Sequence, residues 1–201
     1  MLVKDRMSKP PITIRDNIGV EDALRLMHNE DVRRLPVIDK HGKMVGIVSE
    51  LDLLKVSPSP ATSLSVYEIP YLLAKVKMTD VMTKDVIAVE EDTPLEEAAR
   101  IMADNKIGGL PVMRDGNLVG IVTETDLFKT FLEMLGGREE GVRISMFVPD
   151  EEGMLAKIAG RISEMGINIT ALSTIMGEDP SQYLVTIRVE ADADEDALVE
   201  A

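Results

Sequence analysis

Two copies of one short polar motif carry the side chains with the clearest chemical potential. The first, GIVSELD, spans residues 46–52, and the second, GIVTETD, spans residues 120–126. Each places a carboxylate three positions after a hydroxyl: Asp52 after Ser49, and Asp126 after Thr123. If a strand ends at the hydroxyl and a helix follows, free backbone N–H groups and the positive end of the helix dipole can bind a phosphate. The carboxylate can then accept hydrogen bonds from a ribose diol.

The same spacing has a purely structural interpretation. A Ser or Thr followed three residues later by an acid is close to a capping box, which stabilises a helix start by about 1 kcal/mol. A single copy of the motif favours capping. Two copies in register, each with a glycine in the preceding strand, favour ligand binding.

The elements that position these motifs form an internal repeat. The tripeptide LPV occurs twice, 75 residues apart, and the offset extends back to Met7 and Met82 and forward, with one residue lost in a turn, to both motifs. Apolar residues at i, i+3, i+4 and i+7 predict a helix after residue 20 and another after residue 95. Thr93 is the expected N-cap of the second of these. Each repeat therefore reads β-α-β-β-α, with first strands at 12–14 and 86–89.

The remaining chain divides into linkers and a third region. Residues 57–63 are rich in Pro and Ser and predict a loop, residues 66–77 are apolar, and residues 136–141 predict a linker. Strands are expected at 142–148, 167–175 and 182–189, and helices at 153–166 and 191–201. The predicted domains are 1–62 and 63–135 for the two repeats, 136–141 for the linker, and 142–201 for the last domain.

Composition restricts the function classes. The 201 residues carry 22 basic and 36 acidic side chains, a net charge of −14, which opposes binding to nucleic acid. No Cys and only two His residues are present, so neither a thiolate nucleophile nor a His- or Cys-based metal site is expected. No apolar stretch is long enough to span a membrane and no signal-peptide core opens the chain. We expect a soluble, cytoplasmic protein.

The LPV and G-h-h-[ST]-x-x-D motifs, where h is apolar, make residues 1–135 resemble a pair of CBS domains. The resemblance implies two clefts that bind AMP, ADP, ATP or another adenosine derivative, with no metal and no required cofactor. It assigns ribose contacts to Asp52 and Asp126, and phosphate contacts to Ser49, Thr123 and Thr125. Each adenine would lie on strand residues of the opposite repeat: Ile87, Ile107 and Gly108 in the Asp52 cleft, and Ile12, Val32 and Arg33 in the Asp126 cleft. Ile12 and Ile87 have a second interpretation as plain core residues.

One departure from the internal repeat concerns charge. Arg33 and Arg34 correspond to Gly108 and Gly109. Either the arginines are simply solvated, or they give one cleft cations for phosphate while the other relies on backbone and space. The second interpretation predicts that the two clefts differ in affinity for polyphosphates.

The last region resembles an ACT domain, a ferredoxin-like fold. The matching segments are Val148-Pro-Asp150-Glu-Glu-Gly153-Met-Leu155 and Gly166-Ile-Asn168-Ile169. The resemblance implies a small-molecule site, often for amino acids, at Asp150, Gly153, Leu155 and Asn168. In the alternative interpretation, Asp150 caps the helix and Asn168 fixes a turn. The domain appears truncated, because the sequence ends before a fourth strand.

A CBS pair followed by an ACT domain is the arrangement of the acetoin-utilisation (AcuB) family, which the chain resembles over its length. The expected function is that of a non-catalytic regulator linked to acetoin or carbon metabolism, a homodimer with a target protein still unknown. The alternatives are a nucleotide-hydrolysing enzyme and a nucleic-acid-binding regulator. Against an enzyme, no nucleophile or P-loop motif is present, and both His28 and His41 are expected to face solvent.

Overall fold

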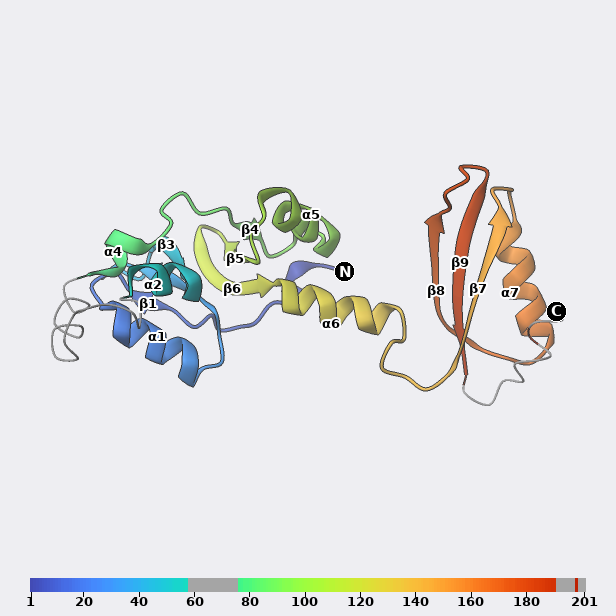
Figure 1. The fold of residues 1–201 in the computed structure, drawn as a ribbon, viewed down its shortest axis with the longest axis horizontal. Coiled ribbons are helices and arrows are strands. Elements are labelled where there is room, and N and C mark those ends of the chain that lie inside the picture. Colours follow the sequence, from blue (N-terminus) through green and yellow to red (C-terminus); the bar gives the residue numbers. More distant parts are fainter. Residues whose placement is uncertain (58–75, 191–197, 199–201) are drawn as a thin grey trace. The chain divides into compact units, whose positions relative to one another are not determined.

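The computed structural model describes residues 1–57, 76–190 and 198 (Figure 1). The chain divides into two compact units, Met1–Leu127 and Phe128–Ala201, and each is described by itself. The predicted boundary near residue 62 and most of the apolar segment 66–77 lie outside the described residues. Within the described residues, none of the helices is long and apolar enough to cross a membrane.

Both predicted repeats have the expected β-α-β-β-α order (Figure 1). The first unit contains them up to the start of the last helix, which continues past Leu127. In both repeats, a very short first strand runs parallel to the second, which pairs antiparallel with the third. The two sheets even share a bulge at the corresponding place, after Val37 and after Val112. The elements are β1 (Ile14–Arg15), α1 (Val20–Asn29), β2 (Arg34–Ile38), β3 (Met44–Ser49) and α2 (Glu50–Val56), then β4 (Val89–Glu90), α5 (Leu95–Asn105), β5 (Gly109–Arg114), β6 (Asn117–Thr123) and α6 (Glu124–Met134).

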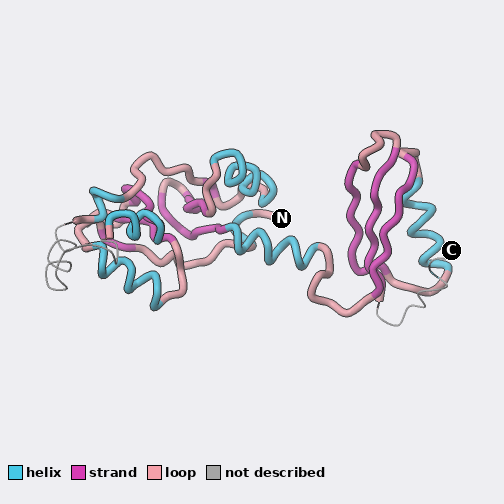
Figure 2. The backbone as a smooth tube through the Cα atoms, in the orientation of Figure 1, coloured by secondary structure: helices cyan, strands magenta, loops and turns pink. Residues whose placement is uncertain are grey.

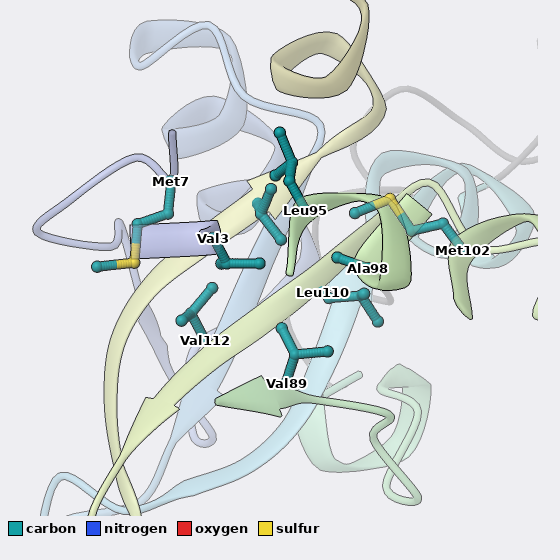
Figure 3. Close-up of a cluster of buried hydrophobic side chains, with 9 residues drawn as sticks. Val3, Met7, Val89, Leu95, Ala98, Met102, Leu110 and Val112 are labelled. Atoms are coloured by element: carbon teal, nitrogen blue, oxygen red, sulfur yellow. The ribbon is translucent and has the colours of Figure 1, made fainter. Parts of the chain in front are cut away.

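The apolar periodicity of the helices becomes the core of each repeat. Helix α5 buries Leu95, Ala98 and Met102 against the strands, and α1 buries its counterparts (Figure 3). The predicted Thr93 cap is wrong, because Pro94 occupies the N-cap position and no side chain caps this helix. The carbonyl of Thr93 instead accepts the N–H of Val3 at 2.9 Å, so this turn holds the N-terminal segment.

Each repeat is completed by the segment that precedes the other repeat. Val3 and Met7 lie in the core of the second repeat, beside β4 and β5 (Figure 3). Ser8 exchanges two backbone hydrogen bonds with Ile121 of β6. In the same way α4 (Met78–Val81), which precedes the second repeat, buries Met78 in the first core, and Thr83 pairs with Ile47 of β3. The exchange makes the two repeats one interlocked body.

Two glycines allow this exchange. A Cβ added at Gly46 would lie 2.5 Å from the Met82 sulfur and 2.9 Å from the Thr83 carbonyl oxygen. At Gly120, the matched position, a Cβ would lie 2.5 Å from the Met7 sulfur. One methionine of each exchanged segment therefore packs directly against a glycine of the other repeat.

The second unit contains one antiparallel sheet with strand order β7-β9-β8. Its elements are β7 (Val142–Pro149), α7 (Met154–Glu164), β8 (Ile169–Met176) and β9 (Gln182–Val189). Helix α7 lies along one face of the sheet (Figure 2), where Ile162 packs with buried residues of β9. Leu198 is helical and belongs to the same core, while the rest of the predicted helix 191–201 lies outside the described residues.

We predict that Gly46→Ala lowers the free energy of unfolding by about 1–3 kcal/mol, because the new methyl group must displace both Met82 and the Thr83 backbone. Urea unfolding followed by circular dichroism measures the change. The control is Gly160→Ala, in the interior of α7, where no atom lies within 4 Å of the added Cβ. This control should be neutral or stabilise by up to about 1 kcal/mol. Equal effects of the two substitutions would contradict the close approach at Gly46.

Candidate functional site

The first unit contains a cavity of about 560 Å³, within the size range typical of small-ligand sites. Its walls come from both repeats. The first repeat supplies the end of β3 and the start of α2, with Ser49 and Asp52, and the second supplies the turn that leads into β5. The lining residues are Arg33, Arg34, Ile47, Ser49, Glu50, Leu51, Asp52, Thr83, Asp85, Val86, Ile87, Lys106, Ile107, Gly108, Gly109 and Pro111.

Ser49 and Asp52 form a reciprocal cap at the start of α2. The Asp52 Oδ2 atom accepts the Ser49 N–H at 3.0 Å and the Ser49 hydroxyl at 2.6 Å, while the Ser49 Oγ atom accepts the Asp52 N–H at 3.3 Å. The structural interpretation of the motif is therefore correct. Capping uses one carboxylate oxygen, and Oδ1 lies 3.9 Å from the Lys55 ammonium, beyond hydrogen-bond distance.

The second motif has the same local geometry but faces elsewhere. Asp126 Oδ2 accepts the Thr123 N–H at 2.8 Å and the Thr123 hydroxyl at 2.7 Å. Neither residue lines the 560 Å³ cavity, and Thr125 is exposed on α6. The two motifs are thus equivalent in the fold but do not share this cavity.

The residues expected to contact a ligand from the opposite repeat differ in position. Some line the cavity, and others pack in a hydrophobic core. Ile87, Ile107 and Gly108 all line the cavity with Asp52. Ile87 is 41% exposed, so it is not a plain core residue. By contrast, Ile12 and Val32 pack against the core of the first repeat and do not line this cavity.

Arg33, which the resemblance assigns to the Asp126 cleft, lines the Asp52 cavity. The Arg33 carbonyl accepts the Glu50 N–H at 2.9 Å, so the start of β2 lies beside the start of α2 in its own repeat. The matched Gly108 carbonyl accepts the Glu124 N–H at 3.2 Å, and Gly108 lines the same cavity. Residues from the corresponding positions of both repeats therefore meet at this one cavity.

Sequence reasoning missed several lining residues. Thr83 and Asp85 lie in the exchanged segment, whose position no motif indicates. Lys106 adopts a left-handed backbone (φ 55°) at the end of α5, a conformation uncommon outside glycine. A basic residue one position before the predicted Ile107 was the available signal for this side chain.

The second unit has a smaller cavity of about 340 Å³ at the turn between β7 and α7. Of the four residues that the resemblance assigns to a small-molecule site, Asp150, Gly153 and Leu155 line this cavity, whereas Asn168 does not. The backbone of Asn168 instead accepts the Glu190 N–H at 3.4 Å. Gly153 is the N-cap of α7 with φ +80°, and no side chain caps the helix, so the alternative role of Asp150 as a cap is wrong.

His28 and His41 are both exposed, as predicted. Within residues 1–57, 76–190 and 198, no group of three His, Cys, Asp or Glu side chains has the geometry to hold a metal ion.

Comparison with known proteins finds a family match that covers both repeats. A family model described as CBS domain matches residues 3–59 and 78–133. An uncharacterized protein of Methanocaldococcus jannaschii is 37% identical over 158 residues, which cover 66% of this chain and 92% of that protein.

The solved structures that resemble the chain include these three. The CBS domain pair of protein MJ0100, in complex with 5′-methylthioadenosine and S-adenosyl-L-methionine, is 34% identical with a TM-score of 0.55 and covers 69% of this chain and 98% of that one. CBSX2 in complex with AMP is 34% identical with a TM-score of 0.53, covering 65% and 96%. A putative acetoin utilization protein (AcuB) from Vibrio cholerae is 33% identical with a TM-score of 0.56, covering 69% and 96%.

We predict that Ser49→Ala lowers the free energy of unfolding by about 1 kcal/mol, because the first turn of α2 loses its side-chain acceptor. Urea unfolding measures the loss. Ser57→Ala is the matched control, since the Ser57 hydroxyl donates to the Leu53 carbonyl at the other end of α2 and satisfies no orphan N–H group. A Ser49 effect no larger than that of Ser57 would show that the cap contributes little.

Proposed function

Since this chain belongs to the CBS domain family, we propose that its paired repeats bind an adenosine-containing ligand in the Asp52 cavity and regulate a partner protein through it. The observation that carries the proposal is one cavity that unites the Ser49–Asp52 motif with Ile87, Ile107 and Gly108 from the other repeat. The complexes of related CBS proteins with AMP, 5′-methylthioadenosine and S-adenosyl-L-methionine support this ligand class.

The chemistry of the cavity suits such a ligand. The adenine ring would lie beside the apolar side chains of Ile87 and Ile107, which line the cavity. The ribose diol would donate to Asp52 Oδ1, the oxygen that capping leaves available, in a charge-assisted hydrogen bond. A ligand bound in this way would leave the cap of α2 intact.

Phosphate groups would meet cations on the same walls. Arg33, Arg34 and Lys106 line the Asp52 cavity, although Glu50 and Asp85 offset part of their charge. We therefore propose that AMP, ADP or ATP binds more tightly here than in the second cleft, at Thr123, Thr125 and Asp126. That second cleft, with Ile12 and Val32, remains a proposed site.

Regulation would follow from the two-sided construction of the cavity. A ligand that contacts both repeats favours the arrangement in which those contacts are made best. Only this difference in affinity between arrangements can shift a conformational equilibrium and alter how a partner binds.

For the second unit we propose an ACT-like domain that binds an amino acid at the β7–α7 turn. The strand order β7-β9-β8, the positive φ of Gly153 and the 340 Å³ cavity at Asp150 support this proposal. Asp150 lines this cavity and is exposed to solvent. Its carboxylate suits the ammonium group of an amino acid.

We further propose a homodimer and a role linked to acetoin or carbon metabolism. Helix α2 exposes large apolar side chains, among them Leu51 (61%) and Leu54 (53%), which a second copy could cover. The metabolic link rests on the likeness to the V. cholerae protein alone. The alternatives, nucleotide hydrolysis and nucleic-acid binding, have no such support in the described residues, where the histidines are exposed and few aromatic side chains are available for stacking.

We predict that Asp52→Asn weakens AMP binding about tenfold or more, because the amide oxygen would keep the place of Oδ2 in the cap and the NH2 group, which cannot accept a hydrogen bond, would face the ribose diol. Isothermal titration calorimetry of the full chain measures the affinity. The matched control is Asp80→Asn, since Asp80 Oδ2 accepts the Lys77 N–H at 3.1 Å in the same capping geometry but does not line the cavity. Unchanged AMP affinity in Asp52→Asn, or equal losses in both variants, would contradict the proposed site.

We expect at least one of the twenty amino acids to bind the second unit with perturbation of Gly153 and Leu155 signals in NMR spectra of the full chain. Asp150→Asn should weaken this binding severalfold, because it removes the charge that meets the ligand's ammonium group. Glu164→Gln, at the far end of α7, is the control and should leave it unchanged. If no amino acid perturbs these signals, the ligand class proposed for this unit is wrong.

A further inference from the structure

Arg34 crosses from the first repeat to the second. It begins β2 opposite Ser49, yet its guanidinium lies against Gly108 of the other repeat. A Cβ added at Gly108 would lie 2.8 Å from the Arg34 Cζ atom, and one at Gly109 would lie 3.3 Å from Cδ. The Gly-Gly pair of the second repeat therefore makes room for the arginine of the first. The close approach of Arg34 requires a residue without a side chain at Gly108.

The acid that meets Arg34 belongs to the second repeat. Glu124 is the first residue of α6 and follows Thr123 of the second motif. Its Oε2 atom lies 4.0 Å from the Arg34 Nη2 atom, an ion pair longer than a hydrogen bond. The Glu124 side chain is 59% exposed and that of Arg34 is 27% exposed. The pair is thus loose on the glutamate side and sheltered on the arginine side.

The surroundings of Arg34 disfavour its positive charge. Burial lowers the pKa of the Arg34 side chain, Glu124 opposes this shift and Arg33 reinforces it. An arginine nevertheless stays protonated in proteins, so a half-buried positive charge persists beside the cavity. Glu50, the counterpart of Glu124 in the first repeat, also lines the cavity, but Glu124 is the acid within ion-pair distance of Arg34.

We propose that Glu124 is a specificity-determining residue of the Asp52 cavity, an internal anion that competes with the phosphate of a ligand for Arg34. Arg34 lines the cavity, whereas Glu124 does not. An uncharged adenosine leaves the Arg34–Glu124 pair in place. A phosphate-bearing ligand must draw the guanidinium away from Glu124, which reduces the preference of the cavity for AMP over adenosine. The inference rests on the proposed function, because it assumes that the cavity binds adenosine ligands.

Calorimetric titration of the full chain with AMP and with adenosine tests the proposal. In Glu124→Gln, AMP should bind about three- to fivefold more tightly, the range expected for removal of one exposed ion pair, while adenosine affinity stays unchanged. Arg34→Met should weaken AMP about tenfold or more and leave adenosine within about twofold. Glu124→Gln introduced into Arg34→Met should have no effect, because the group for which the two anions compete is gone.

Two further variants separate competition from general electrostatics and from folding. Glu96→Gln removes an equivalent first-turn acid from α5, away from the cavity, and should leave both affinities unchanged. Glu124→Asp keeps the charge at the start of α6 but withdraws it by one methylene group, and should give a smaller gain in AMP affinity than Glu124→Gln. Thermal unfolding of each variant checks that it is folded.

The outcomes also separate this inference from the function on which it rests. If the wild-type chain binds neither AMP nor adenosine, the proposed function is wrong. If both bind, but Glu124→Gln changes their affinities equally, changes neither, or still acts in the Arg34→Met background, the competition is wrong while the site stands. AMP binding that is insensitive to Asp52→Asn would place the ligand elsewhere and overturn the inference.

Discussion

The exchange of short segments between the two repeats is the constraint on which the first unit depends. Each three-stranded sheet pairs at β3 or β6 with a segment that precedes the other repeat, through Thr83 and Ile47 or Ser8 and Ile121. Each core also contains a methionine or valine from that segment, such as Met78 in one and Val3 in the other. Because neither core is complete alone, the repeats cannot separate without exposing apolar side chains. A cavity whose walls come from both repeats is therefore a stable part of the fold.

The pseudo-symmetry of the repeats hides an asymmetric site. Local geometry is nearly identical at the two motifs, from the register of the strands to the hydrogen bonds of each cap. The difference comes from Arg34, which lies on the backbone of Gly108. An arginine at position 109, the counterpart of Arg34, would place its Cβ atom 3.3 Å from the Arg34 Cδ atom and would bring a further like charge beside Arg33 and Arg34. In this sequence the first repeat supplies the crossing cation and the second supplies the glycines against which it lies.

Sequence reasoning predicted the elements that depend on local pattern. Helical periodicity located α1 and α5, and β9 begins and ends at the predicted residues, because side-chain burial within one element is encoded by its own spacing. The error at Thr93 lies at a tertiary contact. The Thr93 carbonyl accepts a bond from Val3, some ninety residues away in sequence, and no window around Thr93 contains that information.

The residues of the candidate site were predictable only from the internal repeat and from the family resemblance. The pairing of Asp52 with Ile87 and Ile107 follows neither from composition nor from spacing, since these side chains belong to different repeats. It came from the resemblance, and the cavity brings the same residues together. Thr83 and Asp85 were not predicted because they lie in the exchanged segment. The position of this segment is set by the packing of Met78 and Met82 and not by a motif of its own.

Capping and ligand binding need not compete for the same carboxylate. Asp52 uses Oδ2 for the Ser49 N–H and hydroxyl, which fixes the orientation of the whole group. That constraint also fixes its other oxygen, Oδ1, which lies 3.9 Å from the Lys55 ammonium group. A carboxylate oriented before the ligand arrives loses little conformational entropy when it binds. The cap that first appeared to be the alternative to a binding site is thus the interaction that would pre-organise it.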